Sequence, residues 1–218
     1  MKVALIGATG FVGAKVLAEL LSRGHTVTAV GRKLDGLHEA PGLTARMMDI
    51  SDSVALAKVL EGHDAVVSAF NPGRGTAGDD VYSQHVKGHR AIIDAVKASG
   101  VTRYIAVGGA ASLKAKSGQE FLDSPEFPAE FEPFKGGIRG TREQYYMLKE
   151  EPSLDWVFLA PSVFLTPGTR TGKYRVGGQE VLYDKDGKSH ISLEDYAAAL
   201  VDELEKPAHH KERFTVGY

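Results

Sequence analysis

The sequence predicts an α/β protein built on a doubly wound parallel sheet. A short apolar run at residues 3–6 leads directly into a glycine-rich turn, and segments of helical periodicity alternate with further short apolar runs. Hydrophobic residues make up 43% of the chain and charged residues 25%, which is the balance of a globular protein. At 218 residues, we expect a single domain over residues 1–218.

The first half of the chain supplies the first four strands. The continuous apolar run at residues 3–6, bounded by Gly7, is typical of a strand buried on both faces. From Phe11 onward apolar residues recur at helical spacing, and Gly24 is a stop signal for this helix. Further strands are predicted at 26–30, 43–48 and 64–69, with a helix at 52–60 that is capped by Ser51 or Asp52.

The second half continues the alternation and adds two irregular segments. Residues 111–134, rich in Pro, Glu, Ser and Phe, predict an ordered excursion over the sheet edge. Glycines and β-forming residues at 167–187 predict a hairpin-like unit, so residues 161–190 would form a small lobe on the substrate side. Helices are predicted at 80–99, 137–149 and 193–204, and strands at 103–107, 155–159 and 213–216.

Charge and cysteine content narrow the classes of partner. The chain carries 26 basic and 28 acidic residues without a long run of either sign, so there is no electrostatic footprint for nucleic acid or for an anionic membrane. Cysteine is absent, which excludes disulfides and thiolate metal sites and suits a reducing compartment. We expect a cytoplasmic monomer or homodimer that binds a small-molecule substrate.

The turn after the first strand has the chemistry of an anion site. Gly7 permits a tight turn, Gly10 lets the backbone approach a pyrophosphate, and Gly13 lets the helix pack close to the strand. The helix start presents free N–H groups to the anion. The alternative is a packing cluster without a ligand, and the lack of a following Gly-Lys-Ser/Thr excludes a phosphate-loop NTPase. Cofactor contacts are expected from Gly7, Thr9, Gly10, Phe11, Val12 and Gly13.

With the strand and helix around it, this Gly-x-x-Gly-x-x-Gly turn resembles that of the short-chain dehydrogenase/reductase superfamily. The whole chain is similar to the atypical, epimerase-like branch of NAD(P)H-binding reductases, which includes flavin and biliverdin reductase-like proteins. The similarity extends over 64–69, 107–110, 154–161 and 191–197. It implies a Rossmann-like fold in which further cofactor contacts come from Asp49, Ile50, Ala69, Phe70, Asn71, Val107, Gly108 and Gly109.

The end of the second strand indicates which dinucleotide binds. A carboxylate there would bind the ribose of NAD, whereas an arginine accommodates the 2′-phosphate of NADP. The chain has Arg32 and Lys33 at this place and no acid, which favours NADP(H), with NAD(H) possible. The alternative is that both are solvated loop cations.

The catalytic residues are less well defined. Superfamily enzymes use Ser, Tyr and Lys, with the Tyr and Lys four apart on a helix, and Tyr145 and Lys149 have this spacing. Their place at the far end of their helix argues against them, because ligands bind at the carboxyl edge of the sheet. The equivalent place for the acid falls near residues 131–135, where no Tyr occurs. Ser112 matches the family serine or is a loop serine.

Three further features carry weaker hypotheses. His85 and His89 share a helix face, but without a third ligand we expect a solvated face and no metal. The glycine-rich segment 71–78 either closes over substrate or is a connector. A cluster in the late lobe either contacts an anionic or aromatic substrate or is structural, and it consists of Arg170, Lys173, Tyr174 and Arg175.

Together these features predict an oxidoreductase that transfers hydride from NADPH to a flat conjugated acceptor such as a flavin. A flavin accepts hydride at N5, so alignment of the rings replaces a tyrosine acid. One alternative is a regulatory protein that senses NADP(H) without turnover. Another is a sugar-nucleotide epimerase/dehydratase or hydroxysteroid-type dehydrogenase, in which Tyr145 would face the nicotinamide.

Overall fold

The computed structural model describes residues 1–73 and 79–218, and its centre is an eight-stranded sheet of order β3-β2-β1-β4-β5-β6-β10-β8. Seven of these strands run parallel, and only β8 is antiparallel, to its neighbour β10. This arrangement confirms the predicted doubly wound fold. The strands of the sheet are β1 (Lys2–Ile6), β2 (Thr26–Gly31), β3 (Leu43–Met47), β4 (Ala65–Ser68), β5 (Arg103–Val107), β6 (Asp155–Pro161), β8 (Arg175–Gly177) and β10 (Glu212–Gly217).

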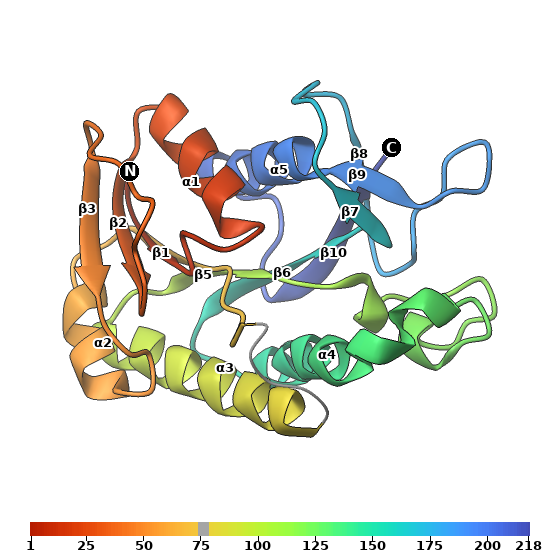
Figure 1. The fold of residues 1–218 in the computed structure, drawn as a ribbon, viewed down its shortest axis with the longest axis horizontal. Helices are drawn as coiled ribbons and strands as arrows, with labels where there is room; N and C mark the ends of the chain where they lie inside the picture. Colours follow the sequence, from red (N-terminus) through yellow and green to blue (C-terminus); the bar gives the residue numbers. More distant parts are fainter. Residues whose placement is uncertain (74–78) are drawn as a thin grey trace.

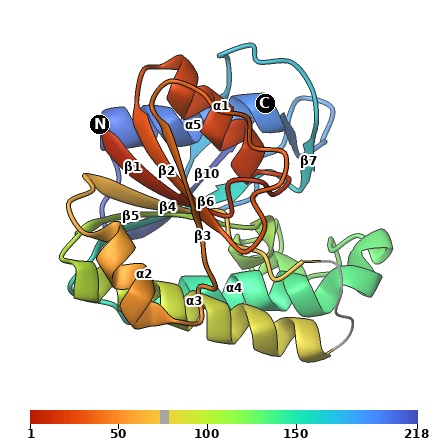
Figure 2. The same cartoon turned by 60° about the vertical axis from the view of Figure 1, so that its left-hand side comes forward.

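Helices cover both faces of the sheet (Figures 1 and 2). One layer holds α1 (Gly13–Ser22) and α5 (Leu193–Glu205), which pack against each other. The opposite layer holds α2 (Ser53–Leu60), α3 (Asp79–Ser99) and α4 (Lys135–Lys149). Because both faces are covered, the central strands are mostly apolar, and every residue from Val3 to Ile6 is at most 1% exposed.

The predicted elements agree with the structure to within one or two residues at most ends. The second helix begins after Asp52, whose carboxylate accepts a hydrogen bond from the Ala55 N–H at 2.9 Å. Asp52, rather than Ser51, is therefore the cap. The excursion at 111–134 is ordered around three 3-10 turns, η1 (Ala110–Ser112), η2 (Phe121–Asp123) and η3 (Ala129–Phe134).

The hairpin predicted at 167–187 is wrong. β8 pairs with the terminal strand β10, and the other strands of the lobe, β7 (Phe164–Thr166) and β9 (His190–Ser192), pair with each other in parallel. Glycines and β-forming residues mark turns and strands, but they do not specify a strand's partner, which here comes from distant parts of the chain.

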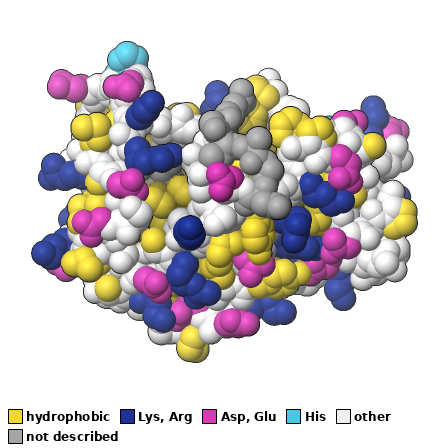
Figure 3. Space-filling view, turned by 60° about the horizontal axis from the view of Figure 1, so that its bottom comes forward, with side chains coloured by type: hydrophobic (Ala, Val, Ile, Leu, Met, Phe, Trp, Pro, Cys, Tyr) yellow, Lys and Arg dark blue, Asp and Glu magenta, His cyan; other side chains and the backbone are white. Residues whose placement is uncertain are grey.

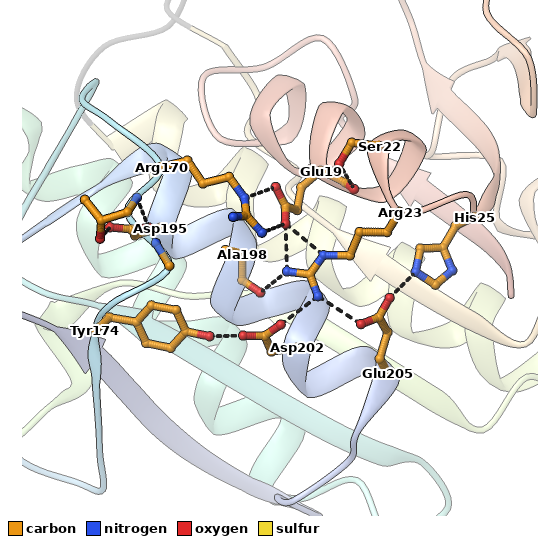
Figure 4. A network of polar contacts seen from close by, with 12 residues as sticks. Glu19, Ser22, Arg23, His25, Arg170, Tyr174, Asp195, Ala198, Asp202 and Glu205 are labelled. Carbon is orange, nitrogen blue, oxygen red and sulfur yellow. Dashed lines mark hydrogen bonds and ion pairs between the residues drawn. The ribbon is translucent and has the colours of Figure 1, made fainter.

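A polar network joins the lobe to the α1–α5 layer (Figure 4). Arg23, which directly follows α1, donates to Glu19 at 2.8 Å and to Asp202 of α5 at 2.6 Å. From the lobe, Arg170 donates two hydrogen bonds to Glu19, at 2.7 and 2.8 Å, and Tyr174 donates to Asp202. Arg170 and Tyr174 thus hold the lobe in place, which favours the structural alternative for this cluster.

The outer face around helices α2 to α4 carries mixed charge. Figure 3 shows Lys and Arg side chains interspersed with Asp and Glu over this face. Across the described residues, no helix combines the length and apolar character required to cross a bilayer.

Candidate functional site

The glycine turn is built by close backbone contacts. Gly7 has φ +81°, a left-handed conformation, and a Cβ there would lie 2.5 Å from the carbonyl oxygen of Ala69. A Cβ on Gly13 would lie 2.0 Å from the carbonyl oxygen of Gly7. The fold itself therefore requires glycine at both positions, because these contacts bring helix α1 against the ends of β1 and β4.

Gly10 lies in a more open environment than Gly7 and Gly13. A Cβ there would meet only the Gly7 carbonyl oxygen, at 3.2 Å, and the residue is exposed. Ala14 makes the first helical hydrogen bond, to the Gly10 carbonyl at 3.0 Å, and no described residue accepts from the N–H groups of Phe11, Val12 or Gly13. Bare backbone beside three free N–H groups at a helix start fits the pyrophosphate of a dinucleotide.

A groove of about 640 Å³ runs beside this turn along the carboxyl ends of β2, β1 and β4. Thr9 at the turn donates to the Lys33 carbonyl at 3.1 Å, which ties the turn to the segment after β2. Nine of the expected cofactor residues line this one groove: Gly7, Thr9, Gly10, Arg32, Lys33, Ile50, Ala69, Phe70 and Asn71.

Arg32 lines the groove and is exposed to solvent. Its Nη2 donates to the Pro72 carbonyl at 2.9 Å, which fixes the side chain across the end of β4. Asp49 is nearby, and the pKa of its carboxyl is lowered by hydrogen bonds from Ser51 and, in smaller part, by the positive charge of Arg32. The remainder of the predicted glycine-rich loop, residues 74–78, lies outside the described residues.

A second, apolar cavity lies at the ends of β5 and β6, next in the sheet after β4. Its volume is about 220 Å³. Gly108 and Gly109, which directly follow Val107 at the end of β5, form one side, and a Cβ on Gly108 would lie 2.3 Å from the Phe158 ring. Three phenylalanines from the 111–134 excursion form an aromatic wall: Phe121, Phe127 and Phe131.

The described lining of the aromatic cavity contains no acid or base. None of the described residues that line it has a side chain that titrates between acidic and basic pH. Its two hydroxyls already donate within the protein: Thr141 to the Gly137 carbonyl at 3.2 Å, and Ser162 to the Val216 carbonyl at 3.0 Å. The cavity can thus hold and align a flat apolar ring, but its described lining offers no free side-chain proton donor.

Ser112, Tyr145 and Lys149 come together elsewhere, around a separate pocket of about 310 Å³. Tyr145 packs against Phe158 at a ring distance of 5.4 Å, and Lys149 is the last residue of α4. Ser112 is fully buried, and its hydroxyl donates to the Gly109 carbonyl at 3.2 Å. None of the three lines the groove or the aromatic cavity.

The prediction of a solvated histidine face is also wrong, because His85 and His89 are each 2% exposed. They pack behind Phe70 of the groove, and burial lowers the pKa of His85 to about 4 and that of His89 to about 3. Among residues 1–73 and 79–218, no group of three or more potential ligands could hold a metal ion.

The fold and the groove define a Rossmann-like dinucleotide-binding protein. A family model described as NAD(P)H-binding matches residues 7–207, so the chain belongs to this family. Together with the structural relatives below, the match identifies an atypical short-chain dehydrogenase/reductase with an oxidoreductase-like fold.

Relatives with nearly full-length coverage support this assignment. YwnB of Bacillus subtilis (strain 168) is 38% identical over 220 residues, covering 99% of this chain and 98% of that protein. A candidate epimerase from Bacteroides thetaiotaomicron is 44% identical with a TM-score of 0.90, covering 100% and 96% of the two chains. A candidate NADH-flavin reductase from Streptococcus pneumoniae is 33% identical with a TM-score of 0.85, covering 100% and 99%.

The aromatic wall was not predicted from the sequence. The phenylalanines of residues 111–134 were visible in the sequence, but their irregular spacing does not indicate which of them share a surface. Thr141 was also missed, because its position depends on how α4 lies against Gly109, where a Cβ would approach the threonine methyl at 3.4 Å.

Proposed function

We propose that this protein transfers hydride from NADPH to a flat conjugated acceptor of the flavin type. The observation that carries the proposal is the aromatic cavity beside Gly108 and Gly109, whose described lining has no titratable side chain. A ketone needs a proton as it takes hydride, whereas a flavin takes hydride at N5 and can be protonated by water. A cavity without an acid therefore suits a flavin better than a ketone.

The chain's own residues would bind and align the two partners. The free N–H groups at the start of α1 would hold the pyrophosphate, and the groove along β2, β1 and β4 would hold the adenosine half. When bound, the nicotinamide supplies the hydride. Phe121, Phe127 and Phe131 would stack on the acceptor and exclude water from the transfer.

We propose NADPH rather than NADH as the donor. Arg32 and Lys33 both line the groove at the end of β2, where the adenosine ribose of a dinucleotide lies in this fold. No acid lines the described part of the groove to accept from a ribose 2′-hydroxyl. The guanidinium of Arg32 offers a planar pair of donors to a phosphate.

The test is flavin-dependent oxidation of NADPH by the purified protein. The reaction is run under anaerobic conditions with FMN or riboflavin and is measured as the loss of NADPH absorbance. We expect saturable turnover that is faster at low NADPH than at equal NADH. If neither flavins nor quinones give turnover above the rate without protein, the proposed acceptor is wrong.

Two phenylalanines of η3 offer a matched pair of variants for the acceptor cavity. Phe131 lines the cavity, whereas Phe134 is 66% exposed and lies outside its lining. Phe131→Leu should raise KM for the flavin by about tenfold, since base–aromatic stacking contributes about 1–3 kcal/mol. Phe134→Leu should leave KM unchanged. Equal effects of the two substitutions would contradict the proposed position of the flavin.

A further inference from the structure

The pocket around Ser112, Tyr145 and Lys149 has a charged lining that the proposed reductase reaction does not use. At about 310 Å³ it lies at the lower end of the range for small-molecule sites. It is formed where the end of α4 and the segment after η1 meet the terminal strand β10. Arg213 of β10 lines it and is only 4% exposed.

Arg213 is a buried cation without a carboxylate partner among the described residues. Its guanidinium donates to the Ser112 carbonyl and, at 2.5 Å, to the side-chain oxygen of Gln179, and it lies 4.4 Å from the centre of the Tyr145 ring. No carboxylate of the described chain forms an ion pair with it, and its buried Nε has no hydrogen-bond partner. Burial lowers its pKa. An uncompensated buried charge is costly, so the pocket favours a bound anion.

The remaining charges around the pocket add to this preference. Lys114 and Lys149 are exposed lysines of the lining, and with Arg213 they make three cations against two carboxylates, Glu120 and Glu180. Glu120 is already engaged, because it accepts from Arg142 at 2.9 Å and from the Tyr146 hydroxyl at 2.5 Å. The lining thus has a formal excess of one positive charge.

A neutral donor is also available to a ligand. The hydroxyl of Tyr145 makes no hydrogen bond to any residue in the described parts of the chain, and it belongs to a side chain of the pocket lining. The Tyr145 ring and the stems of the two lysines provide apolar surface beside these polar groups. This combination suits a ligand with one negative group and a short apolar body.

We propose that this pocket is a second binding site, distinct from the dinucleotide groove, that takes a small organic monocarboxylate. The carboxylate would compensate the buried charge of Arg213 and accept hydrogen bonds from Tyr145 and Lys114. A single negative charge matches the excess charge of the lining, whereas a dianion such as phosphate would exceed it.

The chain contains one tryptophan, which provides a local probe. Trp156 is 3% exposed, and its ring lies 6.4 Å from that of Tyr145. Titration of the protein with propionate, followed by tryptophan fluorescence, should give a saturable change with a dissociation constant in the millimolar range. Sodium chloride at equal ionic strength controls for screening, and inorganic phosphate tests the dianion.

Two lysines near η1 form a matched pair of variants. Lys114 lines the pocket and Lys116 does not, although both are exposed and only two residues apart. Lys114→Gln should weaken propionate binding by at least about threefold, and Lys116→Gln should not change it. Lys114 keeps its backbone hydrogen bonds to Gln179 and Val181 in this variant, so the fold should be retained.

Arg213→Gln should abolish saturation, with a thermal melt to check that this variant is folded. The proposal is overturned if propionate gives no saturable change beyond that of chloride, or if Lys114→Gln binds propionate as the unmodified protein does. It is also overturned if phosphate saturates the signal while propionate does not. None of these outcomes depends on NADPH oxidation, so they are separate from the test of the reductase.

Discussion

Gly10→Ala should weaken NADPH binding strongly while leaving the fold nearly unchanged. A Cβ at this position would meet only one protein atom, the Gly7 carbonyl oxygen at 3.2 Å, so a shift of a few tenths of an ångström accommodates it. Gly10 does not have a positive φ, so alanine is not strained there. The methyl group would instead occupy the space where the pyrophosphate approaches the free N–H groups of α1.

The expected magnitude follows from the hydrogen bonds that the methyl group would displace. A hydrogen bond to a charged group contributes about 1.5–3 kcal/mol, so the loss of one such bond should raise the Kd for NADPH by about 10- to 100-fold. The free energy of unfolding should change by less than about 1 kcal/mol, which corresponds to a shift in Tm below about 4 °C.

Gly13→Ala is the matched control, because its Cβ would lie 2.0 Å from the Gly7 carbonyl oxygen and α1 would have to move. This variant should lose about 1–3 kcal/mol or more of stability. Isothermal titration with NADPH and thermal melting separate the two effects. If Gly10→Ala binds NADPH with unchanged affinity, the pyrophosphate does not lie at this turn and the reasoning is refuted.

Three further outcomes are expected. Arg32→Ala should weaken NADPH binding by about tenfold without changing the affinity for NADH, and an equal loss for both dinucleotides would contradict a 2′-phosphate contact. Tyr145→Phe should keep flavin-dependent turnover within about twofold, whereas loss of this turnover would contradict a transfer that needs no tyrosine acid. Glu19→Gln should lower the free energy of unfolding by about 1–3 kcal/mol at pH 7. Hydrogen bonds from Arg170, then from Arg23, outweigh burial and lower the pKa of Glu19 below 4.5. The difference in the free energy of unfolding should therefore shrink as pH falls below 4.5. A pH-independent difference in urea denaturation would contradict this prediction.

The parts of the site that sequence reasoning recovered are those specified by local chain geometry. Gly13 is required by a contact within the turn, with the Gly7 carbonyl, and Gly7 is required by its positive φ and by the neighbouring end of β4. Their spacing between a strand and a helix indicated the turn. Arg32 follows β2 directly and lies in the groove because the carboxyl ends of parallel strands share an edge. These residues needed only the order of the elements.

The error at the histidines arose where two helices approach more closely than a periodic pattern indicates. His85 and His89 share a helix face and were expected to be solvated because the sequence offered no third metal ligand. Instead, Gly140 lets α4 approach α3, and a Cβ there would lie 2.3 Å from the Cβ of His85. Gly88 likewise admits the ring of Phe70, where a Cβ would lie 2.3 Å away. A glycine on each helix therefore converts an apparent surface into a buried contact.

Consecutive residues of the turn η1 line the aromatic cavity and the charged pocket. Ala111 lines the cavity, Ser112 lines the pocket, and Arg213 donates to the Ser112 carbonyl while the Ser112 hydroxyl donates to Gly109. A carboxylate that draws Arg213 away from the Ser112 carbonyl would remove a hydrogen bond that holds η1, and η1 forms part of the acceptor cavity. Binding linkage is reciprocal, so any factor by which propionate changes the affinity for NADPH must equal the factor by which NADPH changes the affinity for propionate. Propionate titrations with and without saturating NADPH measure that factor, and identical constants would establish that the two sites are independent.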